Sequence, residues 1–205
     1  MARPVTPPFY LASSSPRRRT LLDQIGVRYR TLPMSVDETR RDGEPVRDYV
    51  MRLALAKARC AWRSLPRAAS APVLGADTVV VLDGEPLGKP EGRAQALAML
   101  ARLSGRRHRV MSAVALVEGD REAVRLNVSR VSFRRIGAAE REAYWASGEP
   151  ADKAGAYAIQ GRGAVFVRRL EGSYSGVMGL PLFDTAELLR EFGIEVCAAS
   201  PLAHS

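Results

Sequence analysis

The stretch FYLASSSPRRRTLLDQIG, residues 9–26, sets the start of the fold. Residues 9–12 are a short apolar run and predict a buried strand. Ser15 is a natural N-cap, Pro16 suits the first position of a helix, and Gly26 can end it. One helix face would carry Leu21, Leu22 and Ile25. The stretch therefore predicts a strand that passes directly into a helix.

Working outward, helical and strand patterns alternate along the remaining chain. Further helices are expected over 46–62, 91–103, 138–146 and 182–192, and strands over 27–32, 73–82, 107–117, 122–135 and 164–170. Residues 64–72 are expected to form a loop, and Asp83-Gly84 a turn. Because the alternation is not a strict strand–helix–strand repeat, it favours an α/β fold with a mixed sheet. The 205 residues suit a single domain, 1–205.

Composition narrows the class of protein. The two cysteines, Cys60 and Cys197, lie in no CxxC motif, so a disulfide framework or zinc site is not expected and a cytoplasmic location fits. No apolar run reaches the length that spans a bilayer, and no signal peptide is evident. The net charge of +9 indicates anionic partners. Nucleic acid is disfavoured, because the arginines are scattered without an aromatic platform.

Lysine is rare in this basic chain. Of 31 basic residues, only Lys57, Lys89 and Lys153 are lysines. A compact ammonium and a planar guanidinium are not interchangeable. A lysine in this background therefore marks a place where arginine does not fit, unless the imbalance is a coding bias.

Five groups of residues can carry chemistry. Cations in the first turn of the helix after residue 15 oppose the helix dipole, and a bound anion would reverse that sign. Ser13, Arg17 and Arg18 are thus either a phosphate receptor or part of a basic surface turn. Asp77, followed by Thr78, interrupts an apolar strand, where a carboxylate needs a pairing partner, a metal or a catalytic role.

The other three groups are weaker taken singly. Lys89, between Gly88 and Pro90, would lie close to the Asp77 strand, and could equally be a solvated loop lysine. The pair Asp37-Glu38 could ligate magnesium or simply be a polar loop. The block 152–161 is rich in glycine and charge, and its Gln160 can donate and accept, as reading a base edge requires. Ser173 could cap a helix.

Taken together, these residues closely resemble the Maf proteins, nucleoside triphosphate pyrophosphatases also described as septum-formation inhibitors. The resemblance runs from Leu11 to about Phe192. It is carried by residues 11–18, 37–38, 55–58, 75–78, 88–90, 152–161, 172–174 and 179–182. It implies an inosine-triphosphatase-like fold, with a central mixed sheet flanked by helices in an elongated, two-lobed molecule with a central cleft.

The resemblance also implies an activity and its residues. Nucleoside triphosphates would be cleaved between the α and β phosphates, with a divalent cation, Mg²⁺ or Mn²⁺, and frequently by a homodimer. By position, Asp77 matches the catalytic acid, with Lys89 and Glu38 expected to assist, and Glu38 and Asp77 to hold the metal. The expected substrate-binding residues are Ser13, Arg17, Arg18, Lys57, Thr78 and Gln160.

The block 152–161 is similar to the dTTP/UTP branch of the family rather than the 7-methyl-GTP branch. The chain departs from the family at Ser112, Ala158 and Leu170, which puts pocket shape rather than catalysis in question. A non-enzymatic, nucleotide-binding regulator of cell division is the alternative function. The combination of Glu38, Asp77 and Lys89 favours catalysis, since a pure binder would not require all three.

Overall fold

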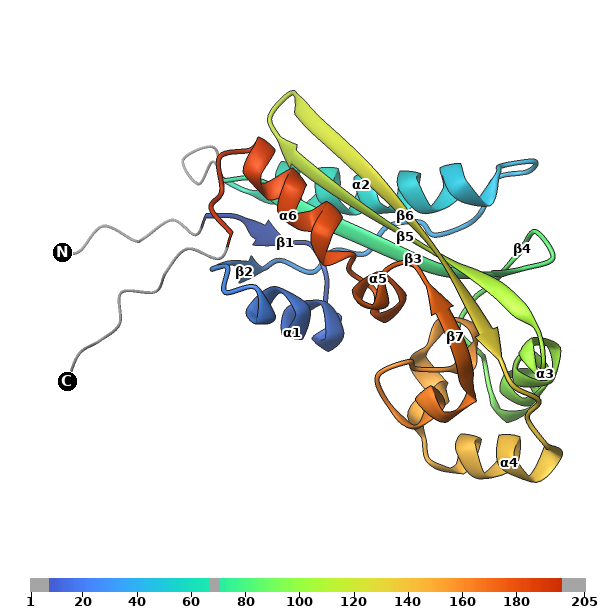
Figure 1. Ribbon diagram of the computed structural model, residues 1–205. Coiled ribbons are helices and arrows are strands. Elements are labelled where there is room, and N and C mark those ends of the chain that lie inside the picture. Colours follow the sequence, from blue (N-terminus) through green and yellow to red (C-terminus); the bar gives the residue numbers. More distant parts are fainter. Residues whose placement is uncertain (1–7, 67–70, 197–205) are drawn as a thin grey trace, which may run out of the picture.

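The computed structural model describes residues 8–66 and 71–196, and its centre is one mixed sheet (Figure 1). Within these residues the sheet order is β2-β1-β3-β5-β6-β7, and β4 pairs with β3 outside that path. β1 is parallel to β2 and β3, and the other pairs are antiparallel. The strands are β1 (Tyr10–Leu11), β2 (Arg30–Thr31), β3 (Val73–Leu82), β4 (Glu85–Leu87), β5 (Arg107–Glu118), β6 (Arg121–Phe133) and β7 (Val167–Glu171).

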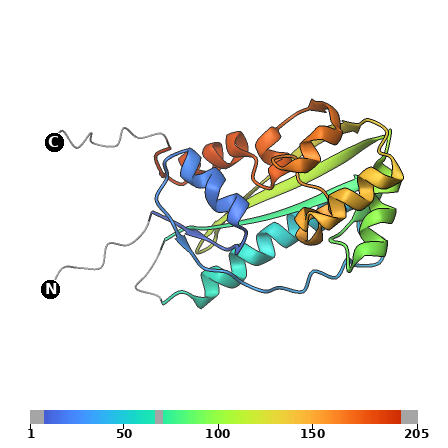
Figure 2. The ribbon, with the colours of Figure 1, turned by 90° about the horizontal axis from the view of Figure 1, so that it is seen from below.

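Helices cover both faces of this sheet (Figure 2). The α-helices are α1 (Pro16–Gln24), α2 (Val46–Ser64), α3 (Arg93–Leu103), α4 (Ala138–Ala146), α5 (Tyr174–Met178) and α6 (Leu182–Glu191), and the 3-10 helices are η1 (Glu149–Asp152), η2 (Ala154–Ala156) and η3 (Arg162–Phe166). None of the helices in the described ranges has the length and hydropathy to cross a membrane.

Alternate side chains of β3 point to opposite faces of the sheet, and they show which helices pack on each face. Val73, Val79 and Val81 pack against α2 on one face. Leu74 points to the other face, where α1 and α6 bury Leu22 and Leu188 against it. Toward the far end of the same face, a separate apolar cluster is formed by α3, α4, the 3-10 helices and the ends of β5 and β6. The molecule is therefore elongated, with two ends that share the long strands (Figure 1).

One edge of β3 lacks a paired strand along part of its length. β1 pairs with β3 only at Val73 and Leu74, and β4 pairs with it from Val80 to Leu82. Between them, residues 75–79 have no strand partner on that edge in the described part of the chain. Asp83 and Gly84 turn β3 into β4 with positive φ at both positions, 56° and 86°, as a tight hairpin turn requires. The middle of β3 is thus open from the side.

Most expected elements are confirmed, including the mixed sheet flanked by helices. The strand expected over 164–170 is wrong in its first half, because residues 162–166 form η3 and only residues 167–171 pair with β6. The strand expected over 27–32 shortens to β2. Ser64 belongs to α2, and part of the expected loop, residues 67–70, lies outside the described residues, as does Cys197. Ser173 does cap α5, accepting from the Gly176 amide.

Candidate active site

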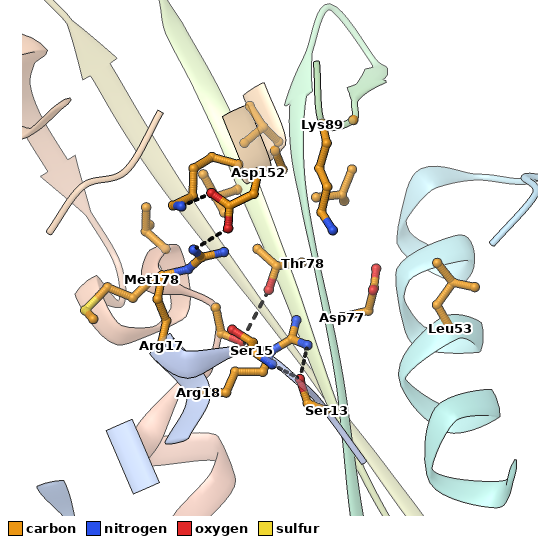
Figure 3. A pocket seen from close by; sticks show the side chains of 18 of the residues that line it. Ser13, Ser15, Arg17, Arg18, Leu53, Asp77, Thr78, Lys89, Asp152 and Met178 are labelled. Atoms are coloured by element: carbon orange, nitrogen blue, oxygen red, sulfur yellow. Dashed lines mark hydrogen bonds and ion pairs between the residues drawn. The ribbon is translucent and has the colours of Figure 1, made fainter. Parts of the chain in front are cut away.

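A cleft of about 520 Å³ lies beside the open edge of β3. That volume is typical of small-ligand sites. All nine residues singled out from the sequence line it, which are Ser13, Arg17, Arg18, Glu38, Lys57, Asp77, Thr78, Lys89 and Gln160. They come from α1, α2, β3 and several loops, so the fold brings together groups that are far apart in the chain (Figure 3). Their roles stay predictions, but their convergence is a property of the structure.

One wall of the cleft is the start of α1. The Arg18 guanidinium donates from Nη1 to Ser13 Oγ at 3.1 Å and from Nε to the Gly179 carbonyl at 2.9 Å. Burial lowers the pKa of Arg18, and the charge of Asp77 opposes this. Ser15 stands at the N-cap position, but its side chain makes no cap hydrogen bond. Instead its amide donates to Ser13 Oγ at 3.2 Å, so Ser13 orders this wall.

Lys57 is the centre of the opposite side. Its ammonium donates to Asp77 Oδ1 at 2.8 Å and pairs with Glu38 Oε1 at 2.6 Å. α2 can approach β3 this closely because the strand has glycine at position 75. A Cβ there would lie 2.2 Å from the Ala54 carbonyl oxygen and 2.8 Å from the Ala58 amide nitrogen. Close helix–strand packing therefore sets the Lys57–Asp77 pair.

The two carboxyls of this cluster titrate differently. Burial raises the pKa of Asp77, against the charges of Lys57 and Arg18. Burial also disfavours the charged form of Glu38, but the hydrogen bond and charge of Lys57 outweigh it and lower the pKa of Glu38. Glu38 is much the more exposed, with 59% of its side chain accessible against 13% for Asp77. Asp77 is thus the stronger proton acceptor of the pair.

Neighbouring residues of β3 serve opposite faces. Asp77 faces α2 through Lys57, whereas Thr78 faces α5. The Thr78 hydroxyl lies 2.9 Å from Ser112 Oγ on β5 and 3.4 Å from the Gly179 carbonyl oxygen. The open edge of β3 lets side chains from both faces line one cleft.

The far wall is the segment after α4. Asp152 pairs with Arg17 at 3.5 Å and also with Lys153, so this wall meets α1 across the cleft (Figure 3). Tyr157 is buried, whereas Gln160 is exposed and lines the cleft. Glu149 accepts hydrogen bonds from the Tyr144 hydroxyl and from the amides of residues 162 and 163. These bonds hold the loop that carries Gln160.

The lysine argument finds support in this geometry, because Lys57, Lys89 and Lys153 all line the cleft. Lys153 was not singled out as a site residue from the sequence, although its rarity was a usable signal. Sequence reasoning gave no site role to Gly179, whose carbonyl positions Arg18. A backbone acceptor has no sequence signature. Ser112 was noted in the sequence only as a departure from the family, and the structure shows its hydroxyl 2.9 Å from Thr78 Oγ1 and 2.6 Å from the Gly176 carbonyl oxygen.

The carboxylates suit a hard divalent cation. Within the described ranges no group of three or more His, Cys, Asp or Glu side chains could enclose a metal. Two carboxylates, Glu38 and Asp77, do converge on the Lys57 ammonium. Magnesium is commonly bound by one or two carboxylates together with substrate phosphates. The donor set fits that mode of binding and not an all-protein metal cage.

Known proteins resemble this chain over most of its length. A family model described as Maf-like protein matches residues 8–192. A protein of Alkalilimnicola ehrlichii named dTTP/UTP pyrophosphatase is 61% identical over 92% of this chain and 95% of its own. Proteins with the same name from Methylococcus capsulatus and Aromatoleum aromaticum are 56% and 52% identical, covering 90% and 93% of this chain and 90% and 98% of their own.

One solved structure, described as the Staphylococcus aureus Ham1 protein, aligns with a TM-score of 0.42 and 16% identity, over 61% of this chain and 71% of that one. The assignment rests on the family match and on relatives that are more than half identical over nine-tenths of the chain. On those grounds, this protein belongs to the Maf-like family.

Proposed function

We propose that this protein hydrolyses dTTP and UTP between the α and β phosphates, releasing the nucleoside monophosphate and pyrophosphate. One observation supports this most directly. Asp77, a buried carboxylate with a raised pKa, faces a cleft that also holds Arg17, Arg18, Lys57 and Lys89. A general base set among cations is the combination that hydrolysis of a phosphoanhydride requires. The names of the relatives support the nucleotide class.

The triphosphate would lie along the open edge of β3. Ser13 and the Gly179 carbonyl already hold Arg18, and its Nη2 makes no hydrogen bond within residues 8–66 and 71–196, so it can contact phosphate oxygens. Arg17 is paired with a largely exposed carboxylate, Asp152, which a phosphate can displace. Lys89 reaches toward Asp77 from the β4 side (Figure 3). These groups would neutralise the charge of the triphosphate and fix its path through the cleft.

Asp77 then acts on water. A water molecule between Asp77 and the α phosphorus transfers a proton to the carboxylate as its oxygen forms a bond to that phosphorus. The bond from the α phosphorus to the bridging oxygen breaks, and pyrophosphate leaves with that oxygen. Lys57 opposes the effect of burial on the pKa of Asp77, and so favours the ionised carboxylate that can accept a proton. Charge stabilisation by the surrounding cations would supply much of the rate enhancement.

Glu38 and Asp77 would hold a divalent cation, Mg²⁺ or Mn²⁺, together with phosphate oxygens. When bound, that ion would supply Lewis-acid stabilisation of the charge on the phosphates. The fit rests on the convergence of the two carboxylates on one point, the Lys57 ammonium. Loss of activity in a chelator, restored by added magnesium, is the expected result.

A panel of substrates tests the function as a whole. Pyrophosphate release is measured with dTTP, UTP, CTP and 7-methyl-GTP, with and without magnesium. We expect dTTP and UTP to be the best substrates and the reaction to need metal. Preference for 7-methyl-GTP would overturn the proposed base specificity. No release from any nucleotide would favour the alternative, a regulator of cell division that binds nucleotides without hydrolysing them.

Two further properties belong to the proposal. We expect a cytoplasmic location, because the chain has two cysteines and neither lies in a CxxC motif. We also expect a homodimer, on the resemblance to the family alone. Light scattering coupled to gel filtration tests the homodimer directly, and a monomer at micromolar concentration would contradict it.

A further inference from the structure

Gln160 follows a buried segment of the chain. Ala158 and Ile159 are buried, and Ile159 packs into the apolar cluster of the far end. The Gln160 side chain is exposed, lines the cleft and makes no hydrogen bond with any residue in the described ranges. Its amide group is therefore available to a ligand, and its place in the cleft depends on the backbone of residues 158–163.

Two hydrogen-bonded side chains, Tyr144 on α4 and Glu149 on η1, hold this backbone on both sides of Gln160. Before Gln160, the Ala158 amide donates to the Tyr144 hydroxyl oxygen at 3.0 Å. After it, the amides of residues 162 and 163 donate to the Glu149 carboxylate at 2.9 Å and 3.0 Å. The Tyr144 hydroxyl donates to Glu149 Oε1 at 2.7 Å. Neither side chain of this Tyr144–Glu149 pair lines the cleft.

Glycines leave the space that these hydrogen bonds need. A Cβ at position 161 would lie 2.3 Å from Glu149 Oε2, and a Cβ at position 163 would lie 2.6 Å from the Tyr144 hydroxyl oxygen. Both distances are too short for atoms that are not bonded to each other. Because Gly161 and Gly163 lack a Cβ, the loop packs directly against the Tyr144–Glu149 pair. A change in the pair therefore displaces the loop.

Glu149 makes these contacts as a carboxylate. Its two oxygens accept three hydrogen bonds and donate none. Burial disfavours the charged form, but the hydrogen bonds from Tyr144 and the two amides outweigh it and lower the pKa of Glu149. Glutamine is not equivalent here. Whichever way its amide is turned, at least one of the two backbone N–H groups faces another N–H.

The groups proposed to bind phosphate are held in other ways. Arg18 is held by Ser13 and by the Gly179 carbonyl. The 3-10 helix η1, on which Glu149 lies, is closed by backbone hydrogen bonds in which the carboxylate takes no part. Loss of the carboxylate should therefore displace Gln160 and leave the phosphate-binding groups in place.

We propose that Glu149, together with Tyr144, is a positioning residue that sets Gln160 against the nucleoside half of the substrate. This role rests on the proposed function, in which the triphosphate lies along the open edge of β3 and the Gln160 amide is left for the base. That amide can pair with a carbonyl and an N–H of uracil or thymine, and a backbone fixed in advance lowers the entropic cost of the pairing. Glu149 thereby strengthens nucleoside binding without touching the nucleoside.

The test measures binding rather than turnover. Isothermal titration calorimetry in magnesium compares two probes, the α,β-imido analogue of dUTP and inorganic triphosphate, which has no nucleoside. In Glu149→Gln the affinity for the dUTP analogue should fall roughly tenfold, the range for one hydrogen bond, while the affinity for inorganic triphosphate stays that of wild type. An equal loss for both probes would mean that the variant loosens the whole cleft, and the proposal would then be wrong.

Failure of the proposed function gives a different result. A wild type that binds the dUTP analogue but hydrolyses no nucleotide would overturn the hydrolytic function and not the role of Glu149. A wild type that binds neither probe would overturn both.

A matched control is the same substitution on α4. Glu140 is also a carboxylate that accepts from a backbone amide, that of Gly137 at 2.9 Å, and it does not line the cleft. Glu140→Gln should leave the affinities for both probes unchanged. If it weakened the dUTP analogue as much as Glu149→Gln does, the effect would be a general one of this end of the molecule, and the proposal would fail.

Two further variants connect the effect to Gln160 and cover poor folding of Glu149→Gln. Tyr144→Phe removes the hydroxyl that accepts from the Ala158 amide and keeps the ring against Phe166, so it should reproduce the selective loss. Gln160→Ala should also weaken the dUTP analogue alone, and on that background Glu149→Gln should weaken it no further. An additive second loss, or a Gln160→Ala variant that binds like wild type, would overturn the proposal.

Discussion

At the scale of single residues, Asp77 carries two conflicting demands. Burial raises its pKa, which makes it a better base, while Lys57 at 2.8 Å lowers the pKa and favours the ionised form. Either influence alone would make Asp77 a poorer general base. Without Lys57 the carboxyl would be protonated over a wider pH range, and without burial it would be a weak proton acceptor. The position in mid-strand gives the burial, and α2 gives the lysine.

Asp77→Asn tests this role. The amide has the same shape but cannot accept the proton from water, so we expect turnover of dTTP to fall on the order of 100-fold or more. Because ionising a buried carboxyl opposes folding, the melting temperature should not fall below that of wild type. The control is Asp37→Asn, an exposed acid that hydrogen-bonds the Thr39 amide and does not line the cleft. Near wild-type turnover in Asp77→Asn would refute the assignment.

The pKa of Asp77 also predicts a pH profile. The base must be ionised to act, so activity rises as pH increases through the pKa of Asp77 in the folded protein. Since burial raises that pKa above the ordinary 3.8, the acid limb of kcat/KM for dTTP should have its midpoint above that value. Lys57→Met removes the opposing cation and should move the midpoint higher still. A midpoint that moves lower would contradict the account of Lys57.

At the scale of elements, the packing of α2 on β3 determines the site. Gly75 faces backbone atoms of α2 that cannot move independently of the helix. Gly75→Ala should therefore push α2 away, destabilise the protein by roughly 1–3 kcal/mol and separate Lys57 from Asp77, with a matching loss of activity. Urea unfolding and pyrophosphate release measure the two effects. Gly92→Ala is the control, because its φ of 174° suits any residue and its Cβ would have no neighbour within 4 Å.

Elements with a strong periodic pattern were predictable from the sequence, and those held by long-range contacts were not. β3 and α4 match their expected bounds, because their patterns end at clear turn signals. Residues 164–166 are as apolar as a strand, yet they belong to η3, in which Glu149 holds the amides of residues 162 and 163. No local pattern shows that a distant carboxylate will do so.

For the site, the sequence indicated several of the residues but not how they come together. Side chains with unusual chemistry for their surroundings, such as Asp77 in an apolar strand, were visible in the sequence. That they share one cleft depends on the missing strand partner of residues 75–79, which is a matter of tertiary pairing. The contacts of the Gly179 carbonyl with Arg18 and Thr78 depend on the position of α5. Backbone acceptors of this kind can be found only with coordinates.

At the scale of the whole molecule, the two ends share β3, β5 and β6, so loss of packing at one end should reach the other. His108 is a sensitive point in the far end. It is 2% exposed, lies against Phe133 and Tyr157 with edge-on ring contacts, and its Nε2 is 2.9 Å from the Tyr157 hydroxyl. Its Nδ1 has no hydrogen-bond partner among the residues that the structure describes. Burial lowers the pKa of His108 from 6.5 to about 4.

That shift predicts how stability depends on pH. Between pH 6.5 and about 4 the unfolded chain binds a proton at His108 that the folded protein does not, so the free energy of unfolding falls as the pH drops through this window. The loss should be about 2 kcal/mol by pH 5, since each unit of pKa shift is worth about 1.4 kcal/mol. His108→Phe keeps an aromatic ring but cannot be protonated. Urea unfolding at pH 7.5 and pH 5 should therefore show a smaller difference in this variant.

The comparison of the two pH values matters more than either stability alone. His108→Phe loses the hydrogen bond to Tyr157 and should be less stable than wild type at pH 7.5, where both carry an uncharged ring. Acidic groups titrate near pH 5 in both proteins, so their contribution cancels in the difference. The second histidine, His204, lies outside the described residues, and His204→Phe measures its share. A pH effect that disappears in His204→Phe and persists in His108→Phe would refute the role of His108.

A single unfolding transition at both pH values would show that the far end and the Asp77 end unfold together through the strands they share.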